Sequence, residues 1–405
     1  MLLRFTLLLP IVLALLSGCT TIGFSQSAEP EAVLKKPAQE IAEAELLDVW
    51  VELFSPGTLP EDKEDASGLS LEIRKAEARY MPVQLRDTMA KTGYWGAVRV
   101  VPQGNQGGEL LVKGTINSSD GETVELRITA LDAVGREWFS RDYDAEITVE
   151  DYKKSERTAR DVYQPLYNTI ANDLAEYRSS LKPKEITEIR RVAALRFAAN
   201  LAPDAFASYV QEKDGEYKVI RLPSDEDPIF QRANAIRDRD FLLVDTLNGH
   251  FDNFNKNMQV PYTQWRKTRL DEVLALREIE TEARNRKLLG AAAIIGAIGV
   301  QILGGSENRG AANVASGVLV VGGAAALKSG FDKDSETTIH RDAIAELGDS
   351  FAAEAEPLVI EVEGETHELT GSAEIQYKKW QSLMKRIYAA ETGLPVAETD
   401  PRKTL

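Results

Sequence analysis

Two apolar runs separated by a short polar turn constrain the fold of this chain more than any other feature. Residues 288–305 contain Gln301 as their only strongly polar side chain, and residues 311–327 form the second run. As helices, the runs would each be about 26 Å long, close to the ~30 Å hydrocarbon core of a bilayer. Glycine and alanine recur in both runs, and such small side chains let two helices approach closely. The sequence therefore predicts a tight helical hairpin over residues 288–327.

Three environments are compatible with this hairpin. It can pack in the helical core of the chain itself, insert into a membrane, or form the self-association surface of a homo-oligomer. The preceding residues 262–287 have the pattern of a long charged helix. Its charges suit a membrane surface and a solvated face equally well. The three interpretations therefore stay open at this point.

The N-terminus has the three parts of a bacterial export signal. Arg4 supplies a positive charge, and residues 5–16 are apolar apart from Thr6 and Pro10. Small residues precede Cys19 in the LSGC motif of residues 16–19. This motif resembles the lipobox of bacterial lipoproteins, in which the chain is cleaved before the cysteine and the thiol is lipidated. The resemblance implies a signal peptide over residues 1–18 and lipidation at Cys19. An ordinary export signal with an incidental cysteine is the alternative.

The residue after the cysteine bears on the membrane to which such a protein is attached. In lipoproteins an Asp at this position usually means retention in the inner membrane, so Thr20 indicates by resemblance the periplasmic face of the outer membrane. Acyl chains on Cys19 would provide the attachment, each contributing about 0.8 kcal/mol per buried methylene. Cys19 is the only cysteine among 405 residues. Disulfides within one chain and cysteine-based zinc sites are therefore excluded.

Composition and motifs argue against several classes of function. A formal net charge of -16 disfavours a nucleic-acid partner, because phosphate binding needs a basic surface. The histidines His250, His340 and His367 lie far apart, and no HExxH, GxSxG or P-loop sequence occurs. Matches to SxxK and KTG occur in the wrong order for a penicillin-binding enzyme and without SDN. We therefore expect a protein that is not an enzyme, with no catalytic residues, no metal and no cofactor.

Residues 46–150 carry the periodicity of a small α+β domain. An alternating strand from about residue 48 is followed by a helix in which Pro82 occupies the first turn and Leu85 and Met89 share one face. A meander of further strands follows. The stretches VRVVP, LLVKGTI and LRITALDAVGREW resemble the small α/β domain of envelope lipoproteins such as curli-secretion channel lipoproteins and activators of penicillin-binding proteins. The resemblance implies an interaction module without catalytic residues.

Helical patterns dominate after this domain, with one ambiguous stretch. Residues 203–260 are mixed: residues 217–222 suggest a short strand, whereas residues 241–247 fit either a strand or a helix. Nearer the C-terminus, residues 358–370 suggest a small β-hairpin. Residues 373–392 have the spacing of a final amphipathic helix. The fold class predicted for the whole chain is therefore α+β.

These observations predict seven consecutive segments. They are a signal peptide (1–18), a flexible tether (19–45), the α+β interaction domain (46–150), a helical region (151–287), the Gly/Ala-rich apolar hairpin (288–327), a helix-hairpin-helix unit (328–393) and a tail (394–405).

The function expected from the sequence is that of a lipid-anchored envelope lipoprotein. It would act in the periplasm as a non-enzymatic interaction or assembly factor, attached to the membrane through Cys19 and bound to envelope protein partners. The alternative is a membrane-active oligomer in which residues 288–327 insert into the bilayer as part of a pore or a scaffold. An enzyme of an unfamiliar type is the third hypothesis.

Overall fold

The computed structural model describes residues 25–28, 32–59, 70–105, 107–224, 226–303, 342–343, 345–346, 358–362 and 365–393. At residues 25, 276, 279–280, 282–303, 358–362 and 365–366 the backbone alone is described. The predicted signal peptide, the predicted lipidation site Cys19, the second apolar run and the predicted tail lie outside these residues. The fold belongs to the α+β class, as predicted.

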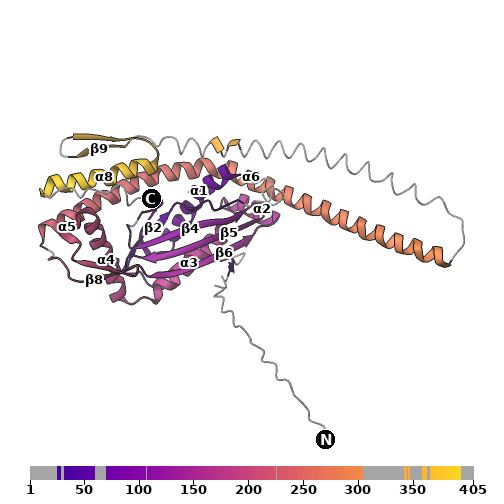
Figure 1. The fold of residues 1–405 in the computed structure, drawn as a ribbon, viewed down its shortest axis with the longest axis horizontal. Helices are drawn as coiled ribbons and strands as arrows, with labels where there is room; N and C mark the ends of the chain where they lie inside the picture. The colour runs from indigo at the N-terminus through magenta and orange to yellow at the C-terminus, as the bar shows by residue number, and fades with distance from the viewer. Residues whose placement is uncertain are drawn as a thin grey trace, which may run out of the picture.

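A six-stranded mixed sheet lies at the centre of the body (Figure 1). Its strands are β1 (Ser25–Ser27), β2 (Leu47–Glu52), β3 (Trp95–Val101), β4 (Leu110–Ser119), β5 (Thr123–Asp132) and β6 (Glu137–Glu146). The spatial order is β1-β6-β5-β4-β2-β3. β2 pairs in parallel with β3 and β4, whereas β4, β5 and β6 form an antiparallel meander. The predicted order of strand, helix and meander is confirmed, since α1 (Leu71–Ala90) connects β2 to β3.

Helices and two small hairpins surround the sheet. They are the 3-10 helix η1 (Glu43–Glu45), the helices α2 (Val149–Thr158), α3 (Gln164–Ser180), α4 (Pro183–Leu201), α5 (Pro203–Phe206), α6 (Pro228–Leu303) and α8 (Ala373–Thr392), and the strand pairs β7 (Val210–Lys213) with β8 (Glu216–Val219) and β9 (Leu358–Val362) with β10 (Glu365–Leu369). The predicted C-terminal hairpin and final helix are confirmed. α8 lies beside the N-terminal half of α6 (Figure 1).

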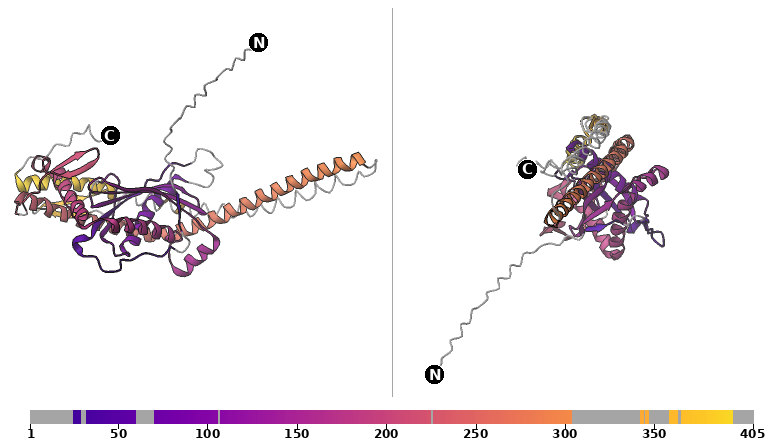
Figure 2. Two further views of the ribbon diagram at one scale, coloured as in Figure 1. Left: turned by 90° about the horizontal axis from the view of Figure 1, so that it is seen from below. Right: turned by 90° about the vertical axis from the view of Figure 1, so that its right-hand side faces the viewer.

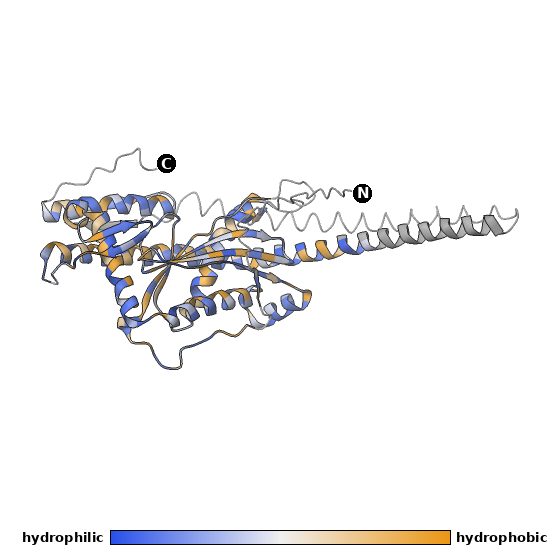
Figure 3. Ribbon diagram, turned by 60° about the horizontal axis from the view of Figure 1, so that its bottom comes forward, coloured by the Kyte–Doolittle hydropathy of each residue, from blue (hydrophilic) through white to orange (hydrophobic). Residues whose placement is uncertain are grey.

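Two hydrophobic clusters pack against the sheet. Side chains alternate along a strand, so Val49 and Val51 of β2 enter the larger cluster while Trp50 enters the smaller one. The larger cluster joins the sheet to α1, α3 and the middle of α6, and the smaller joins it to α4, α8 and the N-terminal half of α6. Figure 3 shows hydrophobic and hydrophilic residues interleaved along the strands and along α6. The predicted boundary at residue 150 therefore falls inside one core.

Pro82 lies inside α1, not in its first turn as predicted, because the helix begins at Leu71. Proline has no N–H, so the carbonyl oxygen of Ala78, four residues earlier, lacks its helical donor. The backbone N–H of Phe54 donates to this oxygen at 2.9 Å. The segment after β2 thus supplies the missing hydrogen bond, and the helix continues through the proline.

α6 is a single helix of 76 residues, longer than the predicted helix at residues 262–287. It includes the ambiguous residues 241–247 and runs through Pro261. The reason is a continuous apolar stripe: Phe254, Met258 and Trp265, on both sides of the proline, are all buried in the larger cluster. Burial of this stripe outweighs the local preference for a helix start after proline.

The first apolar run continues α6 as far as Leu303, which confirms a helix in its described part. The second run lies outside the described residues, so the hairpin over residues 288–327 stays a prediction. Among the helices that the structure describes, none combines the length and apolar character needed to cross a bilayer.

The predicted flexible tether of residues 19–45 is largely part of the folded body, so this prediction is wrong for most of its length. Residues 25–27 form β1, which pairs in parallel with β6. Farther along, the side chain of Asn172 on α3 binds the backbone on both sides of Leu34: it donates to the carbonyl of Val33 at 2.9 Å and accepts from the N–H of Lys35 at 2.7 Å. Side-chain amides on α3 thus fix a segment whose composition alone resembles a linker.

Candidate functional site

A cleft of about 600 Å³ lies where β2, α4, α6 and α8 meet. Its volume is within the range of small-molecule sites, roughly 300–1,000 Å³. Its lining combines charged and aromatic side chains, among them Trp50, Arg196, Tyr217, Arg237, Asp240 and Lys385. No other described cavity joins so many separate elements of the chain around charged side chains. This cleft is the candidate functional site.

The indole of Trp50 forms one wall of the cleft against a glycine-rich loop. A Cβ atom at Gly107 would lie 2.1 Å from the indole ring, and one at Gly108 would lie 2.8 Å from it. Gly108 also has a φ of +84°, a conformation that favours glycine. Only glycine therefore lets the loop backbone lie flat on the ring. The ring of Phe241 on α6 meets the indole edge-on, with 6.4 Å between the ring centroids.

Four cations line the cleft, and they differ in how they are compensated. Arg190 pairs with Glu109 at 3.3 Å. Arg196 stacks over the ring of Tyr217, with 3.9 Å from its Cζ to the ring centroid, and donates to a backbone carbonyl at 2.8 Å. Among the described residues, no carboxylate lies within 4.0 Å of Arg196, Arg237 or Lys385. Asp48, Glu109 and Asp240 line the cleft as well, so these three cations stand without a direct ion pair in a lining of mixed charge.

Asp240 is a buried carboxyl group in the same cleft. It accepts hydrogen bonds from the indole N–H of Trp380 at 3.1 Å and from the hydroxyl of Tyr377 at 3.5 Å. Burial raises the pKa of Asp240 to about 7, against the lowering effect of these two donors. The group therefore changes its charge near neutral pH, which is unusual for an aspartate.

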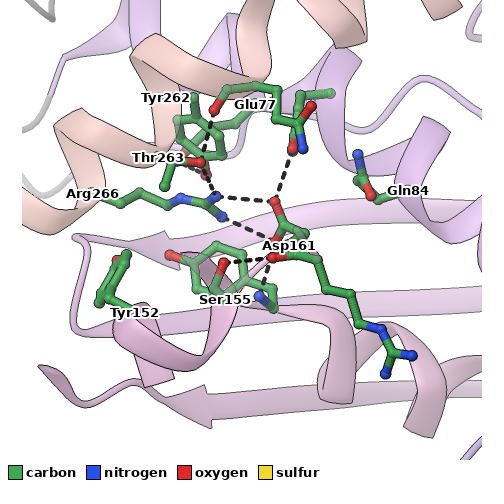
Figure 4. A network of polar contacts seen from close by, with 12 residues as sticks. Glu77, Gln84, Tyr152, Ser155, Asp161, Tyr262, Thr263 and Arg266 are labelled. Atoms are coloured by element: carbon green, nitrogen blue, oxygen red, sulfur yellow. Dashed lines mark hydrogen bonds and ion pairs between the residues drawn. The ribbon is translucent and has the colours of Figure 1, made fainter. Parts of the chain in front are cut away.

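A second polar cluster, entirely buried, fastens α6 to the body (Figure 4). The guanidinium of Arg266 binds the carboxylate of Asp161 through two hydrogen bonds of 3.1 and 3.0 Å, and both side chains are at most 2% exposed. Arg266 also stacks on Tyr262, with 4.1 Å from its Cζ to the ring centroid. Burial opposes ionisation of Asp161, yet the charge and hydrogen bonds of Arg266 hold its pKa below the ordinary value. This pair holds α6 in one position on the body, because breaking it would leave a charge buried without its partner.

A neighbouring carboxylate extends this cluster to α1 and to the end of β4. Glu77 accepts hydrogen bonds from Ser119 at 2.6 Å and from Tyr262 at 2.7 Å (Figure 4), and Arg74 lies 3.4 Å from it. Burial raises the pKa of Glu77 despite these partners. Glu77, Asp161 and Arg266 are at most 2% exposed, so we assign this cluster a structural role.

The structure does not assemble a site from the residues that the sequence singled out. Cys19 and His340 lie outside the described residues, and His250 and His367 belong to different elements, α6 and β10. Among the described residues, no group of three or more His, Cys, Asp or Glu side chains is arranged to hold a metal ion. The cleft was missed because its residues come from distant segments. The glycines around residues 104–108 were its only local signal.

No family model, curated protein sequence or solved structure matches this chain. The similarity of residues 46–150 to domains of envelope lipoproteins therefore stays a prediction.

Proposed function

We propose that this protein is a lipid-anchored lipoprotein of the outer membrane, which faces the periplasm and acts as a non-enzymatic interaction or assembly factor. In addition to the lipobox-like motif, one structural observation supports the membrane anchor. The described body begins at Ser25 in β1, so only residues 20–24 separate it from Cys19. A chain of this length spans at most about 22 Å. A lipidated Cys19 would therefore keep the sheet edge formed by β1 and β6 close to the membrane surface.

The long helix suits contact with a partner away from this edge. With 76 residues, α6 is about 114 Å long. Its middle is fixed to the body by the pair of Arg266 and Asp161, and farther along Arg277 binds Glu122 at 2.7 Å. From there α6 extends past the body (Figures 1 and 2). A body near the membrane with a firmly held arm is the arrangement expected of a protein that connects other components.

Mass spectrometry of the mature protein tests the anchor. We expect an N-terminal Cys19 that carries acyl chains. We also expect a high-salt wash to release a Cys19→Ser variant from the outer membrane. An unmodified Cys19, or a mature chain that retains residues 1–18, would contradict the proposal.

Photo-crosslinking in intact cells tests the arm. A photoreactive amino acid at Thr281, exposed near the start of the projecting part of α6, is compared with one at Glu212, exposed on β7. We expect a discrete protein adduct from position 281 and none from position 212. The same adducts at both positions would argue against a role for the arm.

The helical first apolar run supports one other function. Residues 288–303 extend α6 as an apolar helix, which fits a membrane-active oligomer whose hairpin inserts into the bilayer. Carbonate extraction of the Cys19→Ser variant separates the two functions. Release into the soluble fraction favours the interaction factor, and retention in the membrane favours insertion.

A further inference from the structure

We propose that the cleft between β2, α4, α6 and α8 binds a small ligand through an oxyanion group, either a carboxylate or a phosphate. This inference is independent of the membrane anchor, because it rests only on the side chains that line the cleft. It assigns the cleft as a binding site and Arg196, Arg237 and Lys385 as the residues that recognise the anion.

Three cations of the cleft lack a direct ion pair. Arg196, Arg237 and Lys385 share one half-enclosed space without a carboxylate within 4.0 Å among the described residues. The three carboxylates of the lining have other direct partners: Asp48 pairs with Arg99 at 3.8 Å and Glu109 with Arg190 at 3.3 Å. Asp240 accepts hydrogen bonds from Trp380 and Tyr377. Like charges in a partly desolvated space repel one another more strongly than in water. An anion bound between them would relieve this repulsion.

Arg237 also has an unsatisfied hydrogen-bond donor. Its Nε atom is buried and has no acceptor among the described residues. A buried donor that lacks an acceptor is costly, so such a group indicates a missing partner. The guanidinium group presents its N–H donors as a planar fork that matches the paired oxygens of carboxylate or phosphate. An oxyanion therefore satisfies both the charge and the hydrogen-bonding capacity of this side chain.

The remaining walls indicate the kind of molecule that carries the oxyanion. Trp50, Tyr217 and Phe241 supply aromatic surface beside the cations. Ligand sites commonly combine such apolar walls with a few polar groups that fix orientation. A cleft of about 600 Å³ is larger than an inorganic ion requires. The ligand is therefore an organic acid or phosphate ester with an apolar or flat portion against these rings.

Titration with two simple oxyanions tests the proposal. The full chain, labelled with ¹⁵N-tryptophan, is titrated with sodium phosphate and, separately, with sodium succinate, and sodium chloride at matched ionic strength serves as the control. The indole N–H signal of Trp50, identified by its loss in a Trp50→Phe variant, reports on the cleft. We expect this signal to move saturably with one oxyanion and not with chloride. A preference for phosphate or succinate identifies the class of group, and movement with neither overturns the proposal.

Substitutions on one helix provide a matched comparison. Arg237→Gln removes a cleft cation, whereas Arg232→Gln removes an arginine of α6 that pairs with Glu391 at 3.1 Å outside the cleft lining. We expect the first variant to bind the probe about tenfold more weakly or worse, and the second to bind as the wild type does. Equal affinities in both variants would refute the assignment.

A measurement on the wild-type protein covers the case in which a variant fails to fold. Phenylglyoxal modifies accessible arginines, and mass spectrometry measures the extent at each one. The oxyanion that moves the Trp50 signal should protect Arg196 and Arg237 and leave Arg157, which is exposed on α2, unprotected. Protection that is uniform over all three arginines, or absent from all three, would also refute the site.

Discussion

Asn248 on α6 satisfies both backbone polar groups of Val100 on the edge strand β3. Its Oδ1 atom accepts the N–H of Val100 at 2.8 Å, and its Nδ2 atom donates to the carbonyl of the same residue at 2.9 Å. One side-chain amide thus takes the place of a neighbouring strand. Edge strands with unpaired backbone groups invite pairing with other chains, so this contact both attaches α6 to the sheet and protects its edge.

Replacing Asn248 with alanine should destabilise the protein by about 1–3 kcal/mol, because two buried backbone groups lose their partner. Urea unfolding of the Asn248→Ala variant measures the change in the free energy of unfolding. Thr246→Ala, an exposed position on the same helix, is the control and should change stability by less than about 0.5 kcal/mol. Equal effects at the two positions would show that Asn248 does not protect the edge.

The strands of the meander and the last helix were predictable from the sequence, because their signals are local. Val124, Leu126 and Ile128 alternate with polar residues, and all three are buried on one face of β5. α8 ends at Gly393, which has a φ of +68°. Such periodicities and turn residues need no knowledge of the rest of the chain.

The errors and omissions have a common physical cause. Pro82 suggested a helix start because proline rules are local, and the helix predicted at residues 262–287 was too short. A donor from Phe54 and a buried stripe on α6, which decide the two cases, are tertiary features. The cleft was invisible for the same reason. An unpaired cation such as Arg237 is recognisable only when the surrounding carboxylates have been placed in space.

The buried pair of Arg266 and Asp161 should matter far more than an exposed pair on the same helix. Arg266→Met leaves the carboxylate of Asp161 buried and uncompensated, which costs about 3–5 kcal/mol. Lys267→Met breaks a pair with Glu156 in which both side chains are about half exposed, and exposed pairs are worth about 0–1 kcal/mol. Urea unfolding of both variants gives the comparison. Similar losses in the two variants would show that the buried pair does not fasten α6.

Asp240 should make stability fall as the pH rises towards and through 7. Its pKa is about 7 in the folded protein and about 3.9 in the unfolded chain, so between these values the folded state binds the additional proton. Stability rises with pH only where the unfolded state binds more protons, and here the opposite holds. The difference in unfolding free energy between Asp240→Asn and the wild type should therefore shift in favour of the variant by a few kcal/mol, about 2–4, from pH 5 to pH 8. Urea unfolding at the two pH values measures it, and a difference independent of pH would rule out a raised pKa.

The attachment of the N-terminal segment to α3 can be tested by proteolysis of the folded protein. Asn168 donates to the carbonyl of Ala32, and Asn172 binds Val33 and Lys35. The double variant Asn168→Ala with Asn172→Ala removes these bonds while leaving the core of α3 in place.

We expect trypsin to cleave after Lys35 at least about tenfold faster in this double variant. Each lost hydrogen bond removes roughly 1 kcal/mol or more of stabilisation from the closed segment, so the segment opens locally more often. Ser179→Ala on the same helix, whose hydroxyl donates to the carbonyl of Ala175, serves as the control. Cleavage followed by mass spectrometry gives the rates. Equal rates in the wild type and the double variant would show that Asn168 and Asn172 do not hold this segment on α3.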